Sequence, residues 1–196
     1  NDTLDGGADT DTANYSASAA GVTVDLTVLT AQTSAGDASG DILSGIENVT
    51  GSGMADSLTG STGDNVLSGG NGDDALHGGL GNDTLTGGAD NDDFYFDDAL
   101  GSSNVDTITD FLVTVDEIWL DTTVFASVIS GGVTAGEFVS AVSGPVALDA
   151  DDFLLYDQTT GALFYDADAN GAGAAVQFAT LSNLPALAFD DFVINT

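Results

Sequence analysis

The sequence predicts an all-β fold in which short strands are wound as a coil and β-rich segments lie at both ends. Two observations lead to this prediction. Nonapeptides follow one another without a gap from residue 51 to residue 95, and each begins with Gly. Of the 196 residues, 32 are Asp or Glu and none is Lys or Arg, so the carboxylates have no basic side chain to pair with at neutral pH. Because like charges repel, a compact form of this chain needs added cations.

The five consecutive repeats are GSGMADSLT (51–59), GSTGDNVLS (60–68), GGNGDDALH (69–77), GGLGNDTLT (78–86) and GGADNDDFY (87–95). Their sixth position carries an acid or its amide: Asp56, Asn65, Asp74, Asp83 and Asp92. Their eighth position carries a large apolar residue: Leu58, Leu67, Leu76, Leu85 and Phe94. Glycine supplies the turns and the residues around each apolar position form a strand, so two nonapeptides make one coil and residue i lies over residue i+18.

This geometry predicts calcium between adjacent coils. Stacked strands lie about 4.8 Å apart, and one ion held between two oxygens at calcium distances spans roughly 4.6–5.2 Å. We expect Asp56 with Asp74, Asp74 with Asp92, and Asn65 with Asp83 to share ions, which gives roughly three or more per chain. Backbone carbonyls of the turns complete the predicted ligand set: Gly63, Gly70, Gly72, Gly79, Gly81 and Gly88. The five apolar residues are too few to order a Gly-rich stretch by burial alone, so metal binding is expected to supply the difference.

The pattern GGxGxDxUx, where U is a large apolar residue, resembles the repeat of the RTX (hemolysin-type) calcium-binding proteins. The flanking segments NDDFYFDDALGSSNVDTITDF and DEIWL are similar to those of type I secreted bacterial proteins, including serralysin-like proteases. The resemblance implies a parallel β-roll, calcium-driven folding, and export by a type I secretion machinery that reads a C-terminal signal. Ser52 and Ser61 depart from the second Gly, and Met54 and Asp90 from the fourth-position Gly. The first and last sites are therefore expected to be weaker, or differently built.

Three regions are expected: an N-terminal flank (1–50), the β-roll (51–96) and a C-terminal flank with a secretion signal (97–196). The N-terminal flank holds a degenerate repeat at 42–50, another at the extreme N-terminus, a half-buried strand at 21–29 and a loop at 31–41. Since the chain begins in the middle of a repeat, we expect it to be a piece of a longer protein.

In the C-terminal flank, strands at 105–111 and 117–120 are expected to close the roll. Their acids Asp106, Asp110 and Asp116 are either ligands of a further ion or solvated turn residues. Segments 153–156 and 163–165 suggest a hairpin around QTTG. DADANG (166–171) matches half of an EF-hand loop, but Gln177 replaces the closing Glu, so a plain turn is favoured. Residues 190–194 suit a final edge strand, a secretion-signal end, or both; Trp119 is expected in the core and His77 on the surface.

The composition also limits function. With no basic residues, nucleic acid and anionic membranes are poor partners, and no apolar run is long enough to insert into a membrane. There is no HExxH, nucleophile elbow, P-loop Lys or Cys, so the chain is expected not to be an enzyme. The favoured function is a calcium-binding module that folds outside the bacterial cell and supports secretion and stability of attached upstream domains. The alternative is a calcium-bridged surface-layer or adhesive matrix protein, for which self-association is expected.

Overall fold

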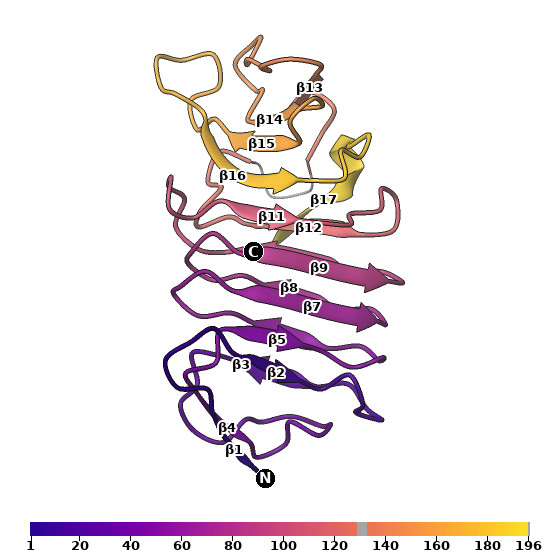
Figure 1. Ribbon diagram of the computed structural model, residues 1–196. Helices are drawn as coiled ribbons and strands as arrows, with labels where there is room; N and C mark the ends of the chain where they lie inside the picture. The colour runs from indigo at the N-terminus through magenta and orange to yellow at the C-terminus, as the bar shows by residue number, and fades with distance from the viewer. Residues whose placement is uncertain (129–132, 196) are drawn as a thin grey trace.

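The computed structural model describes residues 1–128 and 133–195 and is an all-β stack of short strands (Figure 1). The chain starts at one end of the stack and climbs it coil by coil towards the strands β13 to β16 at the other end. Two long sheets form the walls of the stack, and a small pair, β1 (Thr3–Asp5) with β4 (Ile42–Ser44), lies at the N-terminal end. None of the helical segments among the described residues has the length and hydropathy needed to cross a membrane.

The first long sheet has six strands in the order β17-β12-β10-β8-β6-β3, and every pairing in it is parallel. Its strands are β3 (Thr23–Asp25), β6 (Ser57–Thr59), β8 (Ala75–His77), β10 (Asp93–Phe96), β12 (Glu117–Asp121) and β17 (Phe192–Asn195). The chain's last strand β17 therefore forms an edge, preceded by a short 3-10 helix η1 (Phe189–Asp191). The edge strand expected near residues 190–194 is confirmed.

The second long sheet has nine strands in the order β13-β14-β15-β16-β11-β9-β7-β5-β2. Its strands are β2 (Thr12–Asn14), β5 (Asn48–Thr50), β7 (Val66–Asn71), β9 (Thr84–Ala89), β11 (Asp106–Ile108), β13 (Phe138–Ala141), β14 (Leu154–Asp157), β15 (Ala162–Tyr165) and β16 (Val176–Leu181). β14 and β15 pair antiparallel, so the hairpin predicted around QTTG is confirmed. We refer to β13 to β16 as the C-terminal cap.

The repeat register is the one that the nonapeptides predict. Leu58 pairs with Leu76 and Leu76 with Phe94 in one sheet, while Leu67 pairs with Leu85 in the other. All five side chains are fully buried, so each repeat places one apolar residue in the core between the two sheets. Val49 of the degenerate copy pairs with Leu67, and Ile108 and Ile118 continue the two apolar columns beyond the repeats.

The outer face of the six-stranded sheet carries a row of stacked rings. His77 stacks on Tyr95 with 4.1 Å between ring centroids, and Tyr95 stacks on Trp119 with 5.2 Å between centroids. His77 lies on the surface, as expected. Trp119 does not lie in the core, and that prediction is wrong: Ile118 and Leu120 point inward, so the alternation of the strand turns Trp119 outward, where it is partly buried.

Candidate calcium-binding turns

The turn of each repeat places its sixth-position side chain against its first glycine. Asp56, Asn65, Asp74, Asp83 and Asp92 are at most 4% exposed, although each is polar or charged. A Cβ at Gly69 would overlap Asp74 Oδ2, and a Cβ at Gly87 would overlap Asp92 Oδ2. The first glycine is therefore needed because the carboxylate occupies the space that a side chain would take.

The sixth-position side chains link successive coils in a hydrogen-bonded ladder. The backbone N–H of Asp56 donates to Asp74 Oδ1 at 2.8 Å, and that of Asp74 donates to Asp92 Oδ1 at 3.1 Å. On the opposite edge, the N–H of Asn65 donates to Asp83 Oδ1 at 2.7 Å. The three pairs that the sequence predicted to share ions are thus neighbours, joined through one carboxylate oxygen of each pair.

The other carboxylate oxygen is left without a partner in three of the turns. Oδ2 of Asp74, Asp83 and Asp92 is buried and accepts no hydrogen bond from the described residues. A buried carboxylate oxygen without a donor is costly, because it has lost its hydration and gained nothing in return. These oxygens are hard donors of the kind that calcium prefers, so the residues present fit a calcium ion.

The pKa values of the buried carboxyl groups also favour a cation in these turns. Burial raises the pKa of Asp74 and of Asp92 to about 7, and that of Asp83 to about 6, from the ordinary 3.8. Backbone N–H groups that donate to these carboxylates lower the pKa, and neighbouring carboxylates such as Asp56 and Asp92 around Asp74 raise it. Ionised, these groups need a positive charge nearby, and the chain has no Lys or Arg to supply it.

Asp56 and Asn65 have a different environment. Asp56 Oδ2 accepts the N–H of Ser52 at 2.5 Å, and its Oδ1 accepts the Ser52 hydroxyl at 2.8 Å. Asn65 Oδ1 accepts the N–H of Ser61 at 2.6 Å, and its Nδ2 donates to Glu47 O at 2.6 Å. These two predicted site residues share the ladder with the others, but their side-chain oxygens are satisfied within the chain.

The glycines predicted as carbonyl ligands lie in the same turns. Gly70, Gly72, Gly79, Gly81 and Gly88 all have positive φ, whereas Gly63 does not. Within residues 1–128 and 133–195, no three Asp, Glu, His or Cys side chains come close enough to hold one metal ion. An ion bound here would therefore need ligands besides these side chains, and the turn carbonyls stay the predicted ones.

Two further acids continue the ladder beyond the repeats. Asp106 Oδ1 accepts the N–H of Asp83 at 3.0 Å, and Asp116 Oδ1 accepts the N–H of Asp92 at 3.1 Å. Both side chains are 4% exposed, which contradicts the solvated-turn interpretation for these two. A Cβ built on Gly78 would lie 2.6 Å from Asp83 Oδ2 and 3.1 Å from Asp106 Oδ2, so both oxygens face the same point.

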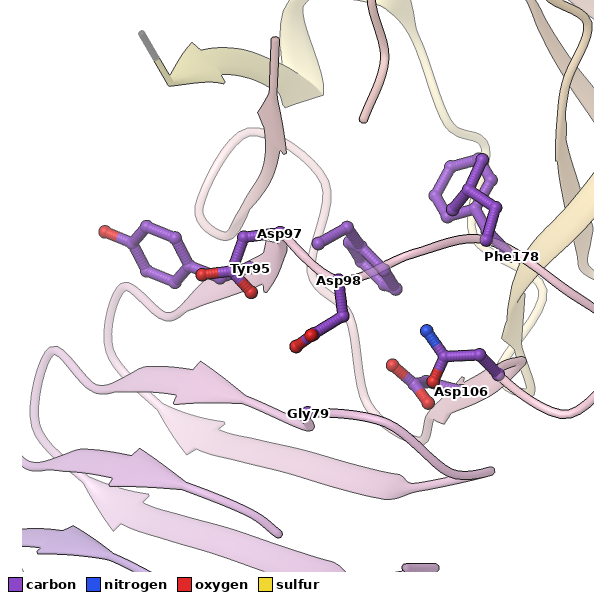
Figure 2. Close-up of a pocket in the computed structure, with 9 residues that line it drawn as sticks. Gly79, Tyr95, Asp97, Asp98, Asp106 and Phe178 are labelled. Atoms are coloured by element: carbon purple, nitrogen blue, oxygen red, sulfur yellow. The ribbon is translucent and has the colours of Figure 1, made fainter. Parts of the chain in front are cut away.

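A small cavity of about 10 Å³ lies beside Asp106, where the chain leaves β10. Figure 2 shows Asp98 and Asp106 over the coil that carries Gly79. Burial raises the pKa of Asp106 to about 7, and the charges of Asp83 and Asp98 add to this rise. The end of the roll thus repeats the anionic environment of the turns with residues from outside the repeats.

The DADANG loop satisfies its own carboxylates. Asp168 Oδ2 accepts the N–H of Gly173 at 3.0 Å, and Asp166 Oδ1 accepts the N–H of Asp168 at 3.3 Å. Gln177 lies in strand β16. These contacts favour the plain turn that the missing Glu suggested.

The chain was compared with protein families, curated proteins and solved structures. The RTX calcium-binding nonapeptide repeat matches in four copies, at residues 1–16, 50–85 and 69–98. No curated protein matches the chain. Among solved structures 29 chains match. One is the solution structure of the AlgE6R3 subunit of a mannuronan C5-epimerase from Azotobacter vinelandii, with 23% identity and a TM-score of 0.38 over 71% of this chain and 78% of that one. Residues 1–16 and 50–98 therefore contain RTX calcium-binding nonapeptide repeats.

Proposed function

We propose that this module folds when calcium binds outside the bacterial cell, and that it supports the secretion and stability of a larger protein of which it is a part. RTX repeat proteins are generally secreted bacterial proteins. The observation that carries the proposal is the set of buried, unpartnered Oδ2 atoms of Asp74, Asp83 and Asp92. Without a cation these oxygens oppose folding, and with one they favour it, so calcium concentration acts as the switch.

The proposed division of the chain follows from this. Residues 51–96 form the calcium-binding roll, residues 1–50 the N-terminal flank, and residues 97–196 the C-terminal flank that carries the type I secretion signal. Several ions are bound, with the sixth-position side chains and the turn carbonyls as ligands. In the low-calcium cytosol the roll stays unfolded, which suits passage through a narrow channel. No catalytic role is proposed for this segment.

Far-ultraviolet circular dichroism and Trp119 fluorescence, recorded while calcium is titrated into chelated protein, test the proposal. Trp119 stacks on Tyr95 across β12 and β10, so its emission reports assembly of the roll's last coils. We expect a cooperative gain of β-structure with a midpoint above cytosolic calcium. Magnesium is the control, because it keeps its own water shell and prefers octahedral sites, and it should not replace calcium. Equal β-structure after exhaustive chelation would refute the proposal.

Sedimentation at saturating calcium separates this function from the surface-layer alternative. A module of a secreted protein is expected to stay monomeric. Calcium-dependent assembly into large oligomers would instead favour the matrix function.

A further inference from the structure

The five repeats contain two kinds of turn, which differ in backbone conformation. In the last three repeats the second and fourth residues all have positive φ: Gly70 (124°), Gly72 (112°), Gly79 (90°), Gly81 (128°), Gly88 (117°) and Asp90 (81°). In the first two repeats none of the corresponding residues does: Ser52, Met54, Ser61 and Gly63. We call these Gly turns and Ser turns. Asp90 belongs with the Gly turns, because it keeps the left-handed conformation although it is not glycine.

The two kinds of turn treat the sixth-position side chain differently. In the Ser turns, the N–H and the hydroxyl of Ser52 both donate to Asp56, and those of Ser61 both donate to Asn65. In the Gly turns no such hydroxyl exists, and Oδ2 of the carboxylate has no donor. The serine donors thus satisfy the side-chain oxygens of the Ser turns, whereas in the three Gly turns a cation would have to do so.

The charge and hydrogen bonds of Asn65 and Asp56 also make the Ser turns poorer cation sites than the Gly turns. Asn65 is neutral, and its Nδ2 points a donor at Glu47 O, so its side chain presents an N–H where a cation would need an oxygen. Asp56 is charged, but its Oδ1 also accepts the N–H of Val22 at 2.6 Å, which gives the carboxylate three donors in all with those of Ser52. Both oxygens of Asp56 are therefore engaged by donors of the chain, whereas Oδ2 of Asp74 has none.

We infer that Asp74, Asp83 and Asp92 serve as carboxylate ligands of calcium, while the Ser turns are closed by the chain itself, so that Asp56 and Asn65 bind none. The inference rests on the proposed function and limits its side-chain ligands within the repeats to three of the five sixth-position residues. Within residues 51–95, calcium dependence begins at Gly69, and the two turns before it in this range are closed by side-chain hydrogen bonds. Ser at the second position of a repeat then marks a turn that needs no metal.

Counting bound calcium by native mass spectrometry and calorimetry in single Asp→Asn variants tests the inference. D74N, D83N and D92N are each expected to lower the number of bound ions by at least one, or to weaken one binding step about tenfold or more. The matched variant D56N is expected to leave the count and the affinities unchanged. A loss of calcium in D56N as large as that in D74N would overturn the inference.

A gain-of-site variant keeps the inference testable if D56N fails to fold. S61G/N65D removes the seryl hydroxyl, allows the positive φ of the Gly turns and introduces a carboxylate, and it is expected to bind one more ion than the unaltered chain. The control S61A/N65D keeps a non-glycine residue at position 61 and is expected to gain none. No extra ion in S61G/N65D would count against the inference. If the unaltered protein binds no calcium, the proposed function itself fails, which is a distinct outcome.

Discussion

Asp157 in the C-terminal cap and Asp74 in the roll have carboxylates with opposite environments. In the cap, Asp157 Oδ1 accepts the hydroxyl of Thr159 at 2.6 Å and its N–H at 2.8 Å, and Oδ2 accepts the N–H of Gly144 at 3.0 Å. These bonds, led by that from the Thr159 side chain, lower the pKa of Asp157 to about 2. In the roll, burial raises the pKa of Asp74 to about 7.

The two regions also differ in their cores. The cap packs against rings in edge contact, with Phe178 5.0 Å from both Phe96 and Phe125 between ring centroids. The roll buries a single apolar residue per repeat. The cap is thus held by ring contacts to neighbouring parts of the chain, whereas the roll is proposed to need a bound ion.

The largest expected effect is in the cap. Phe178→Ala removes a ring that is 1% exposed and touches two others, and it should cost about 3–5 kcal/mol of unfolding free energy. Urea unfolding in excess calcium measures the loss. The number of bound calcium ions is expected to stay the same, and a fall in that number would show that cap and roll fold as one unit.

A smaller effect is expected in a Gly turn. Gly79 has a φ of 90°, and a Cβ there would overlap Ser61 O. Gly79→Ala should therefore destabilise the roll by about 1–3 kcal/mol and raise the calcium concentration needed for folding. The control is Gly53→Ala, since the nearest atom to a Cβ at Gly53 is Asn71 Nδ2 at 3.8 Å and its φ is not positive. Equal midpoints for the two variants would contradict the assignment of Gly79 to a strained turn.

Acidification should stabilise the calcium-free form. Asp74, Asp92 and Asp106 have folded pKa values of about 7, against 3.8 for an ordinary Asp, so folding takes up protons between these values. The contribution is present at low pH and is lost as pH rises through about 7. Circular dichroism in chelator should show more β-structure at pH 5 than at pH 8. Calcium should bind more weakly at pH 5, because protons compete for the same oxygens; a reversed order in either measurement would contradict the burial of these groups.

The smallest effect is expected on the outer face. His77 Nδ1 lies 3.2 Å from Asp97 Oδ2, in a pair that is partly exposed. His77→Ala should change the unfolding free energy by less than about 1 kcal/mol. Urea unfolding in excess calcium, compared with the unaltered chain, checks this; a loss as large as that of Phe178→Ala would mean that the ring row carries stability of its own.

The sequence predicts most of the roll, because one periodicity specifies both the register and the position of each buried side chain. Asp106 and Asp116 were harder to assign, since they follow their ladder partners Asp83 and Asp92 by 23 and 24 residues instead of 18. The extra residues between these coils break the 18-residue spacing, so the sequence does not show that the two acids belong to the ladder, and the structure does. The Ser turns are visible as departures from the repeat, but their closed hydrogen bonds depend on backbone angles that no residue pattern specifies. Trp119 was misplaced because an aromatic residue in an apolar run resembles core, although its strand alternates.

The ladder of sixth-position side chains also has a direction. Each carboxylate accepts an N–H from the coil before it, so Asp92 closes the coil of Asp74, and Asp116 closes the coil of Asp92. Asp116 Oδ2 in turn accepts the N–H of Leu112 four residues away at 2.7 Å, so the series ends within a single loop. A stack shortened from the C-terminal side of such a rung therefore leaves a backbone N–H without its acceptor, while one shortened from the N-terminal side leaves a carboxylate oxygen without its donor.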